Sequence, residues 1–161
     1  MNASDCATLI GYKRWADGGL YRVVAGQLDR LPDFDRDVLL QVLDHMHAVD
    51  RIFQHHLLDQ RHGYQRARSP EPMPFAVLAE RARELDDWYV DYVGAVPADG
   101  MDDTVDFAFT NGAPARMRRG DMLLHVALHG TYHRGNAGIL LQKNGVLPND
   151  DRLTDFLGAQ L

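Results

Sequence analysis

Residues 123–141 read LLHVALHGTYHRGNAGILL, and the rest of the chain is best understood from this segment. At 3.6 residues per turn, the segment predicts an α-helix in which His125, His129 and His133 form one row, because residues four apart lie on the same face. An apolar stripe runs beside the row, so the histidines are expected on the inward side of a helical protein. Neighbouring imidazoles in the row can bind one metal ion. Histidines at this spacing are also common on protein surfaces, so a third ligand from another helix is needed.

The candidate for that ligand is His45, in an earlier helix. This helix is predicted to begin in the segment LPDFDRD, where Asp33 or Asp35 can serve as the N-cap, and to end near residue 63. Its apolar stripe includes His45, which is therefore expected on the buried side. A core histidine bonded to a backbone carbonyl is the alternative interpretation. His47 lies about 200° around the helix from His45 and is expected to face solvent.

The remaining pattern completes an all-α four-helix bundle with a long crossover. The chain over residues 63–74 contains three prolines and lacks periodicity, which predicts a long loop and not a tight turn. A single domain over residues 1–161 is expected from the length. The predicted helices cover about residues 3–29, 33–63, 75–93, 120–143 and 152–159, the last being a short C-terminal helix.

A small β-hairpin is predicted before the last long helix. Phe107 and Phe109 alternate with smaller residues, and Asn111-Gly112 follows directly. An Asn-Gly pair after an alternating run favours a type I′ turn, which needs positive φ at both central residues. Pro114 has no backbone N–H, so the second strand is expected only at an edge.

The composition argues against several classes of function. The net charge is −6 and Lys and Arg form no basic run, which disfavours nucleic-acid binding because that binding depends on cations neutralising phosphates. The single cysteine, Cys6, rules out an intramolecular disulfide and has no evident activating partner. The chain has neither a signal-peptide pattern nor an apolar stretch of about 18 residues, so a soluble cytoplasmic protein without a membrane partner is expected.

Three histidines favour particular metals. Neutral imidazoles suit zinc, nickel, copper or iron(II), whereas magnesium and calcium prefer oxygen ligands. Three protein ligands without a fourth are typical of a catalytic site that keeps one position open. The segment HGTYHRG, residues 129–135, contains no carboxylate to act as a general base. Its absence argues against the water-activating chemistry of zinc peptidases.

Four segments together resemble the DinB/YfiT-like metalloenzyme superfamily, in its damage-inducible DinB branch. They are GYKRWADGGL (11–20), LDHMHAVDRIFQHHL (43–57), FAFTNGAPARMRRGDM (107–122) and the histidine segment above, and they occur in the family's order. The resemblance implies a four-helix bundle in which His45, His129 and His133 bind a divalent metal, with zinc or nickel favoured and iron as an alternative. Asn136 stands where the family usually has glutamine, which keeps the amide but shortens its reach.

The resemblance also implies an activity. The superfamily includes enzymes that use low-molecular-weight thiols as nucleophiles, so we expect metal-dependent S-transferase-type chemistry on a small-molecule substrate. A metal-dependent hydrolase and a non-enzymatic, dimeric metal-binding stress protein are the alternatives. Arg134 and Asn136 are candidates for orienting the substrate.

The other chemically notable residues have structural explanations. His125 is expected to line or support the pocket. His56 lies about 16 Å along the helix from His45, too far to share an ion. Surface positions are expected for His47, His55 and His62, and core or pocket-lining positions for Tyr12, Trp15 and Trp88.

The apolar pattern of the first helix indicates that the chain associates with itself. It has more apolar surface than one inward stripe requires, so a homodimer is expected. The apolar positions concerned are Leu9, Leu20, Val24 and Leu28.

Overall fold

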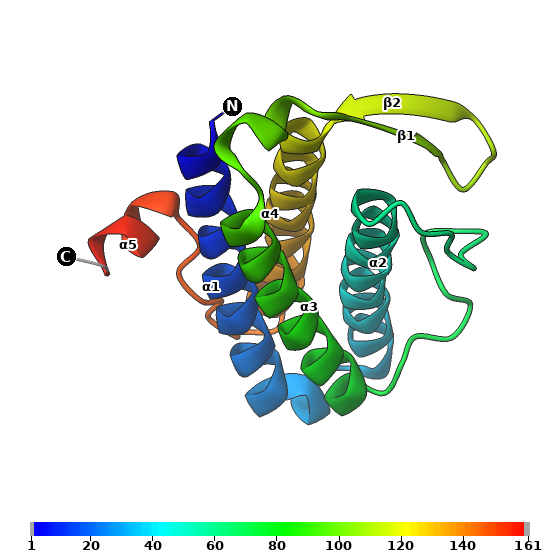
Figure 1. Cartoon of the computed structure of the whole chain (residues 1–161). Coiled ribbons are helices and arrows are strands. Elements are labelled where there is room, and N and C mark those ends of the chain that lie inside the picture. Colours follow the sequence, from blue (N-terminus) through cyan, green and yellow to red (C-terminus); the bar gives the residue numbers. More distant parts are fainter. Residues whose placement is uncertain (1, 160–161) are drawn as a thin grey trace.

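The computed structural model describes residues 2–159, which form four long α-helices, one short helix and a two-stranded hairpin (Figure 1). The long helices are α1 (Ala3–Gln27), α2 (Asp33–Leu57), α3 (Phe75–Ala95) and α4 (Arg119–Lys143), and the short one is α5 (Leu153–Gly158). Short 3-10 turns cover Leu28–Arg30 and Ala98–Asp102. The predicted all-α bundle, with a hairpin before the last long helix, is confirmed.

The helices α1 and α2 lie on opposite sides of the bundle. Each packs against both α3 and α4, which lie between them (Figure 1). The crossover runs down the outside of α2 to the start of α3, and the hairpin strands β1 (Thr104–Ala108) and β2 (Pro114–Arg118) extend over the C-terminal end of α2 (Figure 1). Within residues 2–159, none of the helices is both long and apolar enough to span a membrane.

The ends of α2 differ from the prediction. The helix ends at Leu57 and not near residue 63, because Asp59 adopts a left-handed backbone with φ of 53° and the N–H of Gln60 bonds back to the carbonyl of His55 at 2.8 Å. Asp35 does not cap the helix. It is buried, and its carboxylate accepts hydrogen bonds from the end of α4, whose Lys143 Nζ lies 2.8 Å away.

The hairpin is present, but its turn is not type I′. Phe109 N–H donates to the carbonyl of Ala113 at 2.9 Å, and Gly112 N–H donates to the carbonyl of Phe109 at 2.8 Å. Only Gly112 has positive φ, at 83°, whereas a type I′ turn would also need it at Asn111. The Asn111 side chain instead accepts the N–H of Ala113 at 3.0 Å, which stabilises a longer loop that ends in a glycine bulge.

The apolar core has two clusters along the bundle. The one nearer the hairpin includes Ile10, Phe53, Tyr89 and Val126, and the other includes Leu20, Val24, Leu43 and Leu141. Because Leu20 and Val24 are almost fully buried in the second cluster, the apolar surface assigned to the first helix is largely core. A stripe of exposed apolar side chains occurs on α4 instead: Leu128, Tyr132 and Ile139.

A buried ionic network lies near the middle of the bundle, around Lys13 of α1. Its Nζ atom is 2.7 Å from Asp17 Oδ2, 2.7 Å from Asp50 Oδ2 and 2.6 Å from Asp86 Oδ1. Lys13 is only 1% exposed. Burial alone would lower its pKa, but the three carboxylates outweigh that effect and raise the pKa well above its usual value. The charged amine therefore links α1 to α2 and α3.

Candidate metal centre

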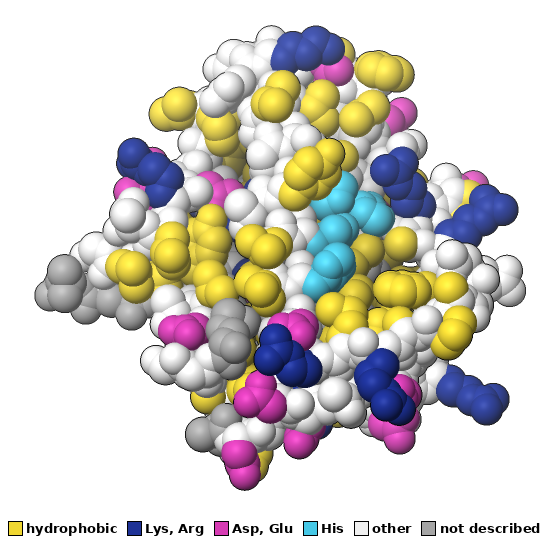
Figure 2. Space-filling view, turned by 90° about the horizontal axis from the view of Figure 1, so that it is seen from above, with side chains coloured by type: hydrophobic (Ala, Val, Ile, Leu, Met, Phe, Trp, Pro, Cys, Tyr) yellow, Lys and Arg dark blue, Asp and Glu magenta, His cyan; other side chains and the backbone are white. Residues whose placement is uncertain are grey.

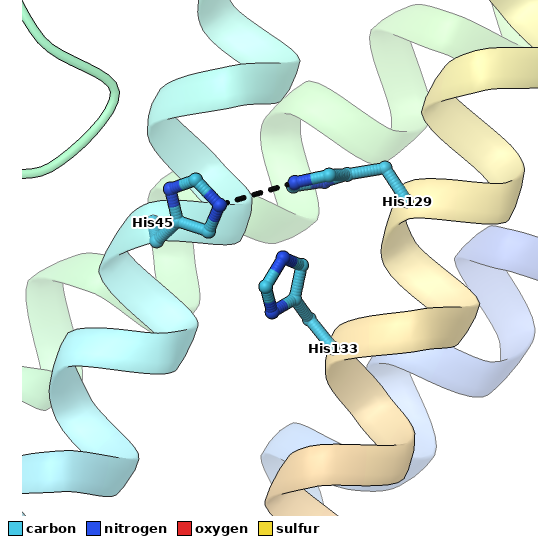
Figure 3. A group of neighbouring side chains, drawn as sticks. All are labelled: His45, His129 and His133. Carbon is cyan, nitrogen blue, oxygen red and sulfur yellow. Dashed lines mark hydrogen bonds between the residues drawn. The ribbon is translucent and has the colours of Figure 1, made fainter.

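The three candidate histidines meet between α2 and α4. His45 projects from α2, while His129 and His133 lie one turn apart on the facing side of α4 (Figure 3). The Nε2 atoms of His45 and His129 are 3.1 Å apart. The ring of His133 completes the group, with its centroid 4.6 Å from that of His45 and 4.4 Å from that of His129. One nitrogen from each ring lies within 4.8 Å of the others, so the structure brings the three side chains together as one group.

The orientation of His45 is set by the crossover loop. Its Nδ1 atom lies 2.5 Å from the carbonyl oxygen of Ala67. A carbonyl can only accept, so Nδ1 carries the proton and the neutral ring has its lone pair on Nε2, which faces His129. This is the outer hydrogen bond that a metal-binding histidine normally makes. Sequence reasoning missed Ala67 because the group that acts is a backbone carbonyl, which any residue could supply.

The geometry fits a transition-metal ion. Nitrogens 3.1 Å apart can both lie about 2.05 Å from one ion at an angle of about 98°, which is near the tetrahedral value. The Nδ1 atoms of His129 and His133 are buried and meet no hydrogen-bond partner among residues 2–159. Only His45 therefore has its outer nitrogen fixed by the described part of the protein.

The site keeps its imidazoles in the form that binds metal. Burial, together with the neighbouring His133 and His45, lowers the pKa of His129 to about 3. Burial also lowers the pKa of His133. Metal ions bind neutral imidazole, so protons compete little with a metal for these two rings at neutral pH.

Aromatic and apolar side chains surround the group. His125 is not one of the three converging rings; it stacks between Phe53, at 4.6 Å, and His129, at 5.7 Å between centroids. It supports the His129 ring, as the sequence suggested. The ring of Tyr132 meets His133 edge-on at 4.9 Å. Figure 2 shows that histidine side chains reach the surface on this face of the molecule, with hydrophobic side chains on both sides.

The nearest large group of buried carboxylates serves another purpose. Asp17, Asp50 and Asp86 also lie close enough together to hold an ion, but Lys13 already occupies the position between them. The three-histidine group contains nitrogen donors alone. This donor set favours zinc, nickel, copper or iron(II) over magnesium and calcium.

Several other histidine predictions were wrong. His47 is only 6% exposed, because residues of the crossover loop and of α3 lie beside it on the side of α2 opposite His45. Burial, with the charges of Arg51 and others, lowers the pKa of His47 to about 4. His55 and His62 are half-buried rather than solvated.

The prediction that Arg134 orients a substrate was also wrong. The side chain is almost fully buried, and its guanidinium lies 2.8 Å from Asp17 Oδ1 and 2.8 Å from Asp151 Oδ2. It therefore joins the buried ionic network and stabilises the fold. Cys6 behaves as expected of an inert thiol, since burial raises its pKa.

The chain matches a known family model over almost its full length. The DinB family model matches residues 4–160, which is nearly the whole chain. Searches of curated proteins and of solved structures found no match. The matched region contains all three histidines and the helices that carry them. The chain belongs to the DinB family.

Proposed function

We propose that His45, His129 and His133 hold a divalent transition metal, and that the chain uses it to transfer a low-molecular-weight thiol to a small electrophile. The observation that carries the proposal is the donor set, which consists of three uncharged rings without a carboxylate. When bound, the ion would supply a positive charge that stabilises a thiolate at its open position. A thiol is suited to this because its pKa starts near about 8.5.

The residues of the chain hold and shield this position. The hydrogen bond to Ala67 orients His45, and His125 with Phe53 holds the ring plane of His129. Burial lowers the pKa of His129 and His133, so at neutral pH the two rings carry no positive charge that would repel the ion. The apolar side chains beside the group lower the local polarity, which strengthens the attraction between opposite charges.

The chemistry balances without a protein base. The thiol proton goes to solvent, the sulfur forms a bond to the electrophilic carbon, and the leaving group departs with the bonding electron pair. A water-activating hydrolase would instead gain from a carboxylate near the site, as in the zinc peptidase motif, and the segment 129–135 has none. The donor set and this absence together support thiol transfer over hydrolysis.

The test is a thioether-forming assay on metal-loaded protein. Cellular thiols would be mixed one at a time with monochlorobimane, whose fluorescence rises when the thioether forms. We expect metal-dependent acceleration with at least one thiol, its loss in His129→Ala, and its retention in His62→Ala, which removes a histidine outside the group. Metal-dependent hydrolysis of nitrophenyl acetate, with no acceleration for any thiol, would replace thiol transfer with the hydrolase.

A further inference from the structure

A second cavity lies on the side of α2 that carries His47. Its volume is about 650 Å³, within the range of small-molecule sites. On α2, His47, Arg51 and Gln54 line it, at spacings of four and three residues that place them on one helix face. On α3, Arg81 and Trp88 line the opposite side, and their spacing of seven residues, about two turns, also places them on one helix face. The cavity thus lies between two helix faces and is separate from the three-histidine group.

The crossover loop lines one side of this cavity and is fixed to α2 at two points. Ser69 and Met73 of the loop line the cavity. Before Ser69 in the loop, the carbonyl of Ala67 accepts from His45 Nδ1 at 2.5 Å, and after it the N–H of Met73 donates to Asp44 Oδ1 at 3.3 Å. Both bonds end on neighbouring residues of α2. The loop is therefore held in place along the cavity wall, which makes the cavity a preformed feature.

Two guanidinium groups in the cavity have only neutral partners. Arg51 donates to the Gln54 side-chain oxygen, and Arg81 lies 3.3 Å from the sulfur of Met73. Across residues 2–159, neither arginine has a carboxylate within 4 Å. Arg51 is half-buried, whereas Arg81 is exposed. Glu84, which is exposed, is the one carboxylate among the described side chains that line the cavity.

The aromatic side of the cavity is rigid. Trp88 stacks on Tyr92, with centroids 4.9 Å apart and an angle of 25° between the rings, and its edge meets Tyr89. Tyr89 is fully buried and donates to the Asp50 carbonyl at 2.6 Å. A fixed indole next to two guanidinium groups is suited to a ligand that combines a flat apolar part with an anionic group.

We propose that this cavity binds a small organic anion, in which a carboxylate or phosphate group meets Arg51 and Arg81 while a flat apolar part packs against Trp88. Both cations can supply charge-assisted hydrogen bonds to the anion, and the half-buried Arg51 is partly removed from water, where such bonds are strongest. Glu84 at the opening opposes the anion, so its removal strengthens binding.

Trp88 provides a local readout. The chain has two tryptophans, and Trp15→Phe leaves Trp88 as the only indole. In this background, Trp88 emission would be titrated with benzoate, phenyl phosphate and inorganic phosphate, with uncharged benzamide as the control for charge. The metal would be removed with a chelator first, so that anions cannot act through the three-histidine group. We expect a saturable change with benzoate or phenyl phosphate at millimolar concentration and none with benzamide; the stronger of the two identifies the anionic group.

Variants that remove one charge inside or outside the cavity would show where the anion binds. Arg51→Gln and Arg81→Gln should each weaken binding about tenfold or more, as expected for loss of a bond to a charged group. Arg83→Gln removes the same charge from the same helix outside the cavity, and should change binding less than about twofold. Glu84→Gln should tighten it. Absence of a saturable change with any anion, equal binding of benzamide, or equal weakening by Arg83→Gln and Arg81→Gln would overturn the proposal.

Discussion

Replacing Lys13 with methionine should be among the most damaging single changes in this protein. Methionine keeps much of the length and volume of the side chain but removes its charge. The Nζ atom makes contacts of 2.7, 2.7 and 2.6 Å to three carboxylates, and Lys13 is 1% exposed. Lys13→Met would therefore leave Asp50 and Asp86 without the cation that compensates their charge.

The expected loss is about 3–5 kcal/mol, the usual cost of removing one partner of a buried ion pair. The three carboxylates place the expected loss at the upper end of this range, although Asp17 keeps its bond to Arg134. Against a total stability of roughly 5–15 kcal/mol, this is a large fraction. For a chain of this length, the melting temperature should fall by roughly 6–20 °C.

Urea unfolding followed by circular dichroism would measure the change. Asp87→Asn is a suitable control, because it removes one carboxylate of an exposed pair on the same helix as Asp86 and should cost less than about 1 kcal/mol. The loss in Lys13→Met should also shrink at acidic pH, where the carboxylates can be neutralised by protons. If Lys13→Met costs no more than the control, the buried network does not stabilise the fold as argued.

Three further outcomes are expected. Burial raises the pKa of Asp86 to about 7 from 3.8, so its contribution to stability is largest below pH 3.8 and disappears as the pH rises through about 7. Urea titrations should show the wild type losing stability relative to Asp86→Asn between about pH 4 and 7, and parallel curves would contradict this. Gly19→Ala should lower the melting temperature, because the added Cβ would lie 2.7 Å from Asn149 Nδ2. Gly26→Ala is the control, since a Cβ there would meet no described packing neighbour within 4 Å, and equal shifts in the two variants would refute the clash. Light scattering should give twice the 18.2 kDa chain mass and Ile139→Asp should halve it, whereas a wild-type monomer at micromolar concentration would exclude the dimer.

The helices and the histidine row were predictable because both depend on local periodicity. A four-residue spacing places His129 and His133 on one face whatever the rest of the chain does, and the apolar stripe of α2 directs His45 to the same side. The resemblance to a known family then joined the two helices, which periodicity alone could not do.

The errors concern residues whose surroundings come from distant parts of the chain. His47 is opposite His45 on α2, but the crossover loop covers that side, and its path depends on hydrogen bonds such as that of Met73 to Asp44. Asp35 resembles a helix cap in sequence but binds the far end of α4. A local pattern contains no information on either contact.

The ionic network does leave a signal in the sequence. Lys13 and Asp17 fall on the same stripe of α1 as the buried Ile10 and Leu20, at spacings of three and four residues. Charged residues within an apolar stripe indicate buried partners, because an unpaired charge in the core is costly. The identity of Asp50 and Asp86 as those partners required the packing of three helices.

Metal content per chain tests the central claim most directly. Wild-type protein, His45→Ala, His129→Ala, His133→Ala and the control His62→Ala would be loaded with zinc or nickel, dialysed and analysed by mass spectrometry. Bound metal should be close to one ion per chain in the wild type and in His62→Ala, nearly absent in His129→Ala and His133→Ala, and strongly reduced in His45→Ala. Full occupancy in any two of the three site variants would show that these histidines do not form the metal centre.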